Sequence, residues 1–163
     1  MHTVRPAGAT DVPFLARGVA ELIAEIRGAA AEPADDGALA VAQDLVAGRL
    51  DGAALVAWSP DGRRHGLITA NRLRSIRTRG PYALIQELWV APEGRALGVG
   101  AALISALCNW ARSAGCAMVE VGLPLPQSPV HANTYHRYTQ WGFTANGPRM
   151  RKIVRTNDDP DRR

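Results

Sequence analysis

Residues 88–101 read LWVAPEGRALGVGA, and this stretch decides the fold. A short apolar run is followed by a loop with three glycines, and residues 101–114 then repeat their apolar side chains at the helical spacing of three and four. The stretch therefore predicts a strand, a glycine-rich loop and a helix. A helix that begins in glycines exposes unpaired backbone N–H groups at its positive end, which is a site for phosphate.

Spacing separates the phosphate-binding loops of this general shape. A P-loop ends in Gly-Lys-Ser/Thr, whereas Gly100 is followed by two alanines, so a P-loop is excluded. The dinucleotide fingerprint G-x-G-x-x-G/A finds Gly98 and Gly100 but meets Leu103 where a small residue is needed. Glu120, at the distance of the ribose-binding acid, keeps that alternative open. A third pattern, R/Q-x-x-G-x-G/A, matches from Arg95 onward.

Length and composition indicate one globular domain. The chain has 163 residues, of which 47% are hydrophobic and 21% charged, so it can bury a core and is not disordered throughout. We expect the domain to span residues 1–155 and a flexible polar tail to span 156–163. Before the glycine loop, strands are predicted at 4–6, 53–58, 65–73 and 82–90, and helices at 12–28 and 39–49. After it, we predict a strand at 117–122, a short helix at 131–141 and a final hairpin at 143–155.

Several classes of protein are excluded at this stage. The sequence contains no run of about 18 apolar residues, the length that spans a bilayer, so no membrane span is expected. The N-terminus has no apolar run behind a basic start, so no secretory signal is expected either. Cys108 and Cys116 form no C-x-x-C pair, which gives no support to a disulfide framework or a zinc site. We therefore expect a cytoplasmic protein without a metal and without a membrane partner.

The net charge of +4 is a local feature. Without Arg72, Arg74, Arg77 and Arg79, basic and acidic residues would be equal at 15 each. A nucleic-acid binder usually spreads its positive charge over one face and interleaves aromatic residues, so nucleic acid is not an expected partner. The segment 72–79 is either a solvated hairpin or a contact for an acidic substrate, a partner subunit or a phosphate.

Two motifs together resemble a known family. The glycine loop, preceded by residues 88–92, resembles the acetyl-CoA-binding signature of the GNAT acetyltransferase superfamily. Residues 138–143, YTQWGF, are similar to that superfamily's Y-x-x-x-G-F motif, and the two motifs stand in the expected order. The resemblance covers nearly the whole chain and implies an α+β fold, with a mixed, mostly antiparallel central sheet flanked by helices and a splayed central strand pair.

The resemblance also implies acetyl-CoA as co-substrate and no metal. Superfamily members often carry Asn seven and Ala four residues before the tyrosine, where this chain has His131 and Thr134, so the group that holds the pantetheine arm stays open. Asn133 lies two residues away from the expected position. The residues assigned to acetyl-CoA are Leu88, Val90, Arg95, Ala96, Leu97, Gly98, Val99, Gly100, Ala101, Asn133 and Tyr138.

The implied activity is N-acetyl transfer to a primary amine by direct attack. Such a reaction needs a donor for the thioester oxygen, a proton acceptor for the amine and a proton donor for the leaving thiolate. The resemblance assigns the first to a backbone N–H near Val90 and the third to Tyr138, which could instead be an ordinary half-buried tyrosine. Glu87 is the candidate base, directly or through water, unless it pairs with an arginine. Glu120, on the adjacent strand, is the other candidate for the base.

Strand alternation suggests where the acceptor binds. Leu88 and Val90 are expected to face the core, which leaves Glu87 and Trp89 toward an acceptor groove bordered also by Trp58. The acceptor is expected to be a small-molecule or peptide amine, and a homodimer is left open. The alternative function is a CoA-binding sensor or partner module without efficient turnover.

Overall fold

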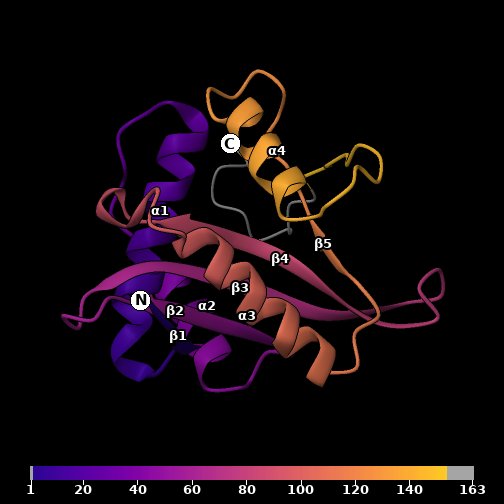
Figure 1. Cartoon of the computed structure of the whole chain (residues 1–163), viewed down its shortest axis with the longest axis horizontal. Coiled ribbons are helices and arrows are strands. Elements are labelled where there is room, and N and C mark those ends of the chain that lie inside the picture. The colour runs from indigo at the N-terminus through magenta and orange to yellow at the C-terminus, as the bar shows by residue number, and fades with distance from the viewer. Residues whose placement is uncertain (1, 154–163) are drawn as a thin grey trace, which may run out of the picture.

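Five strands form one mixed sheet in the computed structural model, which describes residues 2–153 (Figure 1). The spatial order follows the chain, antiparallel from β1 to β4 and parallel between β4 and β5. The strands are β1 (Thr3–Pro6), β2 (Gly52–Trp58), β3 (Arg64–Ser75), β4 (Gly80–Val90) and β5 (Val119–Val121). The helices are α1 (Val12–Arg27), α2 (Asp36–Val46), α3 (Val99–Ser113) and α4 (His131–Gln140), with short 3₁₀ turns at Ala9–Asp11 and Pro92–Gly94. The predicted α+β class is confirmed.

The two faces of the sheet are covered by different helices. On one face, α3 buries Leu103 and Leu107 completely against Ile68 of β3. On the other face, α1 packs Leu15 against Val56 and Leu67 in a second core. Because side chains alternate along a strand, each central strand supplies both cores.

A glycine lets α1 approach the sheet closely. A Cβ at Gly18 would lie 2.5 Å from a methyl carbon of Leu67 and 2.9 Å from the Trp89 ring. The helix ends at Gly28, whose φ of +66° belongs to the left-handed region that favours glycine. This close packing of α1 on the sheet holds the C-terminal half of the helix beside the end of β4.

The splayed strand pair is formed by β4 and β5, which diverge in Figure 1. They pair only from Ala83 to Ile85 of β4, although β4 continues to Val90. The β3 register jumps at the same place, because Thr69 faces Glu87 and the next residue, Ala70, faces Ile85. Gln86 is therefore the extra residue of a β-bulge, and a bulge increases the local twist and bends the strand. The end of β4 is left with a neighbour on one side only.

Two element predictions need correction. The second helix covers 36–46 rather than 39–49, because the Asp35 carboxylate accepts a hydrogen bond from the Ala38 N–H at 2.7 Å and caps the helix earlier. The predicted hairpin at 143–155 is wrong over 143–153, where no residue is in a strand. There the Asn146 side chain bonds to Glu120, so a side-chain contact takes the place of a backbone ladder. The end of that hairpin and the predicted tail at 156–163 lie outside the described residues.

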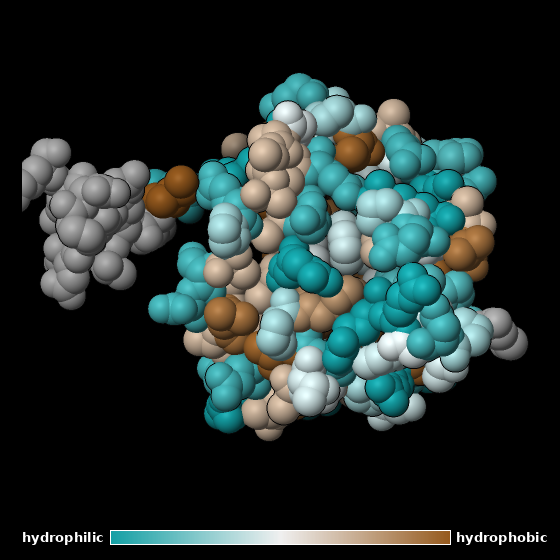
Figure 2. Space-filling view, turned by 90° about the vertical axis from the view of Figure 1, so that its left-hand side faces the viewer, coloured by the Kyte–Doolittle hydropathy of each residue, from teal (hydrophilic) through white to brown (hydrophobic). Residues whose placement is uncertain are grey.

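The outer surface carries no continuous apolar face on the side seen in Figure 2. Hydrophobic residues there are scattered among hydrophilic ones. Within residues 2–153, every helix is too short or too polar to cross a membrane.

Candidate active site

A cavity of about 510 Å³ lies where β4 and β5 separate. Its walls come from α1, the second half of β4, the glycine loop, the first turn of α3, the segment after β5, and α4. The cavity thus joins both sequence motifs, which are about 40 residues apart along the chain, reckoned from Gly98 to Tyr138. It is the candidate active site.

The glycine loop presents backbone N–H groups to this cavity. Ala96 and Gly98 have φ values of +59° and +77°, which turn the chain sharply into α3. The first intrahelical bond runs from the Ala102 N–H to the Gly98 carbonyl at 3.0 Å, so the N–H groups before Ala102 have no helical partner. Arg95 and Arg137 add positive charge to the wall. These groups fit a pyrophosphate, because unpaired N–H groups, a helix dipole and guanidinium groups all favour an anion.

Most residues assigned to acetyl-CoA come together here. All of them line the cavity except Leu97, whose side chain points to solvent with 58% of the residue exposed. Asn133 and Thr134 both line it, from the first turns of α4. The cavity can therefore receive an extended ligand that reaches from the glycine loop to α4.

The backbone at the end of β4 offers a donor to the cavity. The Ala91 N–H donates to the His65 carbonyl at 2.9 Å, so Ala91 faces β3. The backbone N–H and C=O groups of successive strand residues point to opposite sides within the sheet. The backbone groups of Leu88 and Val90 therefore face the gap left where β5 separates from β4. The Val90 carbonyl accepts a hydrogen bond from Nε of Arg95 at 3.0 Å. The Val90 N–H is thus directed toward the same gap, where an oxyanion could accept its hydrogen bond.

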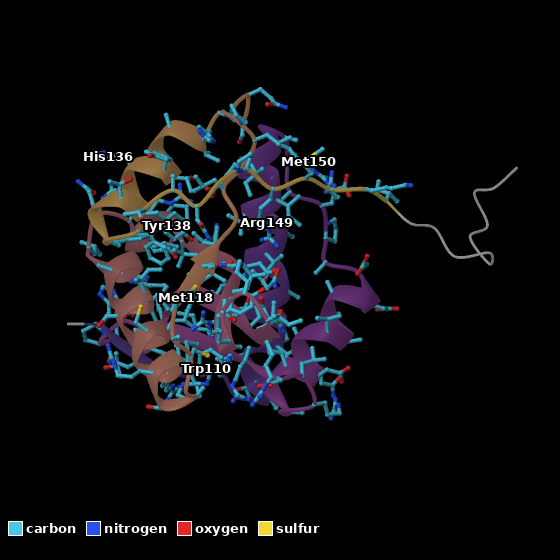
Figure 3. The ribbon with its side chains drawn as sticks, turned by 90° about the vertical axis from the view of Figure 1, so that its right-hand side faces the viewer. Trp110, Met118, His136, Tyr138, Arg149 and Met150 are labelled. Atoms are coloured by element: carbon cyan, nitrogen blue, oxygen red, sulfur yellow. The ribbon has the colours of Figure 1, made fainter. Side chains whose placement is uncertain are left out.

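Tyr138 enters the cavity from α4. It is 7% exposed and lies edge-on to Trp141 and Phe143, with ring centroids 5.4 and 5.1 Å away. Figure 3 shows Tyr138 between α4 and α3, whereas His136 lies on the outer side of α4. Burial alone, with no hydrogen bond contributing, raises the pKa of its hydroxyl well above the usual range. The phenol therefore keeps its proton at neutral pH and can act as a donor.

Glu87 is held by a hydroxyl group rather than by an arginine. The Thr69 hydroxyl donates a hydrogen bond to its carboxylate, and no ion pair among the described residues includes Glu87. Burial raises the pKa of the Glu87 carboxyl, which the hydrogen bond from Thr69 partly opposes. Glu87 shares the α1 face with Trp89, as strand alternation predicted, but it is not part of the cavity wall.

The two tryptophans assigned to the acceptor differ in position. Trp89 lines the cavity, although it is mostly buried under α1, and its indole N–H donates to Glu25 at 3.3 Å. Trp58 does not line the cavity. The guanidinium groups of Arg5 and Arg64 stack on its ring, 4.1 and 4.5 Å from the centroid. At the end of β2, Trp58 thus lies against two arginines rather than in the cavity wall.

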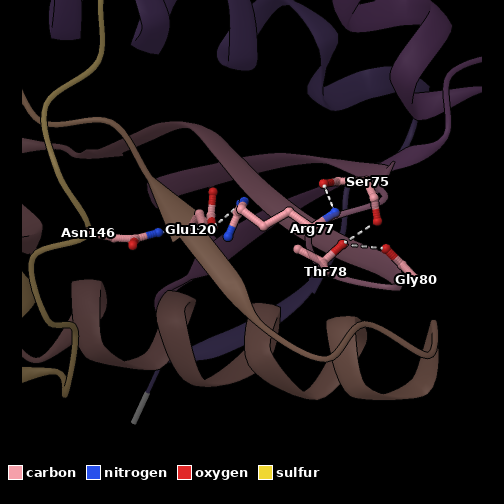
Figure 4. A network of polar contacts seen from close by, with 6 residues as sticks. All are labelled: Ser75, Arg77, Thr78, Gly80, Glu120 and Asn146. Atoms are coloured by element: carbon pink, nitrogen blue, oxygen red, sulfur yellow. Dashed lines mark hydrogen bonds and ion pairs between the residues drawn. The ribbon is translucent and has the colours of Figure 1, made fainter.

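Glu120, on β5, contacts the arginine-rich segment 72–79. Arg77 donates to its carboxylate at 2.8 Å and Asn146 at 3.3 Å (Figure 4). Arg72 bonds to the Ala114 carbonyl at 2.9 Å and to Asp51 at 3.3 Å. Two arginines of this segment thus tie the β3–β4 hairpin to neighbouring elements, and Glu120 does not line the cavity.

Sequence reasoning missed part of the cavity wall. Leu22, Glu25 and Ile26 reach it from α1, Gln86 from the bulge, and Arg137 from α4. Gln86 could have been noticed as a polar residue inside an apolar strand, which is a signal for a bulge. The α1 residues sit in an ordinary amphipathic stripe and carry no such signal. Among residues 2–153, no group of three or more His, Cys, Asp or Glu side chains could hold a metal ion.

Comparisons with known proteins agree with this geometry. Residues 19–143 match the family model of the acetyltransferase (GNAT) family. An acetyltransferase from Trypanosoma brucei is 25% identical, with a TM-score of 0.67 over 94% of this chain and 100% of that chain. Glucosamine-6-phosphate N-acetyltransferase from Arabidopsis thaliana and aminoglycoside 6'-N-acetyltransferase from Acinetobacter baumannii are each 15% identical with TM-scores of 0.70. They cover 95% and 96% of this chain and 99% of their own. No curated protein matches the chain.

Proposed function

Since the chain belongs to the GNAT acetyltransferase family, we propose that it transfers an acetyl group from acetyl-CoA to a primary amine of a small molecule or peptide by direct attack. One observation carries the proposal. The N–H groups of the glycine loop, the backbone of Val90 and the Tyr138 side chain all face one cavity. An acyl transfer needs an anion site, an oxyanion donor and a proton donor together.

The binding roles follow from the cavity wall. The loop from Arg95 to Ala101 and the side chain of Arg137 are proposed to hold the pyrophosphate of acetyl-CoA. Asn133 is proposed to contact the pantetheine arm. Acetyl-CoA, when bound, supplies the activated acetyl group.

The proposed chemical roles use two groups already facing the cavity. The Val90 N–H stabilises the negative charge that develops on the thioester oxygen, since it points into the gap between β4 and β5. Tyr138 gives its proton to the departing thiolate, since its raised pKa keeps the hydroxyl protonated at neutral pH.

Glu87 is proposed as the proton acceptor for the amine. Its raised pKa makes it a better base than an ordinary carboxylate, and because Glu87 does not line the cavity, the proton is proposed to pass through water. That placement also favours a second candidate function, a CoA-binding module without efficient turnover.

One experiment separates the two functions. Thiol release from acetyl-CoA is followed with a panel of polyamines, aminoglycosides, amino acids and peptides, beside calorimetric titration with acetyl-CoA. Amine-dependent thiol release supports the transferase. Tight acetyl-CoA binding without release for any amine supports the binding module, and absence of binding contradicts both.

A further inference from the structure

Glu25 stands at the junction of two cavities. It lies on the inner face of α1 and lines the large cavity together with Trp89. A second cavity of about 300 Å³ adjoins it, and its wall includes the same two residues. A ligand in the large cavity that extends past Glu25 would therefore enter the second cavity.

The Glu25 carboxylate already holds a cation. Arg95 forms an ion pair with it, and the Trp89 indole N–H donates to the same carboxylate oxygen. Nε of the same arginine is bonded to the Val90 carbonyl at 3.0 Å. A short chain of contacts thus links Glu25 to the strand end where the acetyl group is proposed to react. Arg95 shows that a cationic group fits between Glu25 and that strand end.

The charge of the surroundings also differs between the two ends of the site. At the glycine loop, Arg95 and Arg137 favour an anion. In the second cavity, Arg64 is already paired with the buried Asp11 at 2.7 Å. Apart from Glu25, which pairs with Arg95, its other charged groups are Arg17, Glu21 and Glu93, so two carboxylates stand against one guanidinium there. A second positive charge on the acceptor is favoured on this side.

We propose that Glu25 binds the non-reacting cationic group of a diamine or polyamine acceptor, and that Arg95 leaves Glu25 for the pyrophosphate when acetyl-CoA binds. This inference rests on the proposed transferase function and names its substrate class. The pyrophosphate carries more negative charge than one carboxylate, so it competes for the guanidinium. Glu25 is then left beside the Trp89 ring without its cation, and an alkylammonium group can take that place.

The first test compares two amines with the same four-carbon chain, 1,4-diaminobutane and butylamine, in wild type, Glu25→Gln and Glu21→Gln. Glu21 is the matched comparison, one turn earlier on α1: it lines only the second cavity, so Glu21→Gln should raise the KM for the diamine less than Glu25→Gln does. We expect Glu25→Gln to raise the KM for the diamine roughly tenfold or more, the effect of a lost charge-assisted contact. The KM for butylamine and both kcat values should change little. Equal effects on the two amines, or an equal effect of Glu21→Gln, would overturn the inference while leaving the transferase function intact.

The second test needs no turnover. Calorimetry measures binding of 1,4-diaminobutane with and without saturating CoA. Wild type should bind the diamine more tightly with CoA, Glu25→Gln should lose that gain, and Arg95→Gln should bind the diamine more tightly than wild type without CoA. The last effect is a gain, so misfolding cannot produce it. If the affinity for the diamine is the same with and without CoA and is unchanged by both substitutions, the inference is overturned. If the diamine binds as expected but no amine is acetylated, the role of Glu25 in binding a cation is supported and the transferase function is overturned.

Discussion

The two ends of the cavity are built differently. The proposed anion end is made mainly of backbone from one short stretch, residues 95–101, in which two positive φ values and the start of α3 turn the chain, with the side chain of Arg137 added from α4. The proposed acceptor end is made of side chains from α1 and β4, elements that are more than 60 residues apart, as the contact between Glu25 and Trp89 shows. A backbone site depends on local conformation, whereas a side-chain site depends on how distant elements pack.

This difference predicts where a single substitution acts most strongly. Gly98→Val should weaken acetyl-CoA binding by roughly 10³-fold, which corresponds to two charge-assisted hydrogen bonds of about 2 kcal/mol each. No atom lies within 4 Å of an added Cβ, so the loss comes from the left-handed backbone at φ +77° and from the space the phosphate needs. Calorimetric titration with acetyl-CoA measures it.

Gly62→Val is the matched control. Gly62 has φ +80°, equally open surroundings and a place in the β2–β3 turn outside the cavity. It should lose stability without losing acetyl-CoA affinity. Equal affinity losses in the two variants would show that the loop is not the anion site.

Tyr138→Phe tests the region where the two ends meet. The ring and its packing against Trp141 and Phe143 remain, so acetyl-CoA affinity should stay near wild type. Loss of the proton donor should lower kcat about 10²-fold. Tyr135→Phe, on the exposed side of the same helix, serves as the control and should leave kcat unchanged. If kcat under chemistry-limited conditions is the same in both variants, Tyr138 has only a structural role.

Glu87→Gln probes the acceptor side with opposite effects on activity and stability. We expect kcat/KM to fall about tenfold at pH values above the pKa of Glu87 and below that of the amine, where the wild-type carboxylate is ionised and the amine still carries its proton. The difference should shrink in acid, where Glu87 is protonated in the wild type as well. The folded-state pKa of Glu87 is raised, so its favourable contribution to stability is present in acid and is lost as pH rises through the folded pKa. Gln avoids that loss, so the variant should have a higher Tm than wild type at neutral pH, with a smaller difference in acid. Overlapping pH–rate profiles would show that the base lies elsewhere.

The smallest effect is expected at Trp58. Trp58→Phe keeps a ring for Arg5 and Arg64 and lies outside the cavity wall, so acetyl transfer kinetics should not change. Trp89→Phe removes the N–H that holds Glu25 and should raise the KM for a diamine a few-fold. A kinetic defect in Trp58→Phe comparable to that of Trp89→Phe would extend the acceptor site beyond the cavity described above.

Local sequence determined the anion end and the order of the elements. Residues 88–101 encode their own strand, loop and helix start, because positive φ favours glycine and an exposed helix N-terminus follows from the hydrogen-bonding pattern of a helix. The second motif, which contains Tyr138, could likewise be recognised from the spacing of its residues, and the structure brings Tyr138 to the same cavity. The hairpin predicted after it was wrong over residues 143–153, because a turn signal at residues 146–148 does not determine whether the flanking residues pair as strands.

Tertiary structure alone decided the acceptor end. Glu25 occupies one position in an amphipathic stripe, and nothing local distinguishes it from Glu21 until α1 is seated on the sheet through Gly18. Alternation along β4 predicts that Glu87 and Trp89 share a face, yet only Trp89 of the two lines the cavity, and no local feature of the sequence separates them. Backbone conformation is encoded by neighbouring residues, whereas the surroundings of a side chain depend on contacts between residues far apart in the chain.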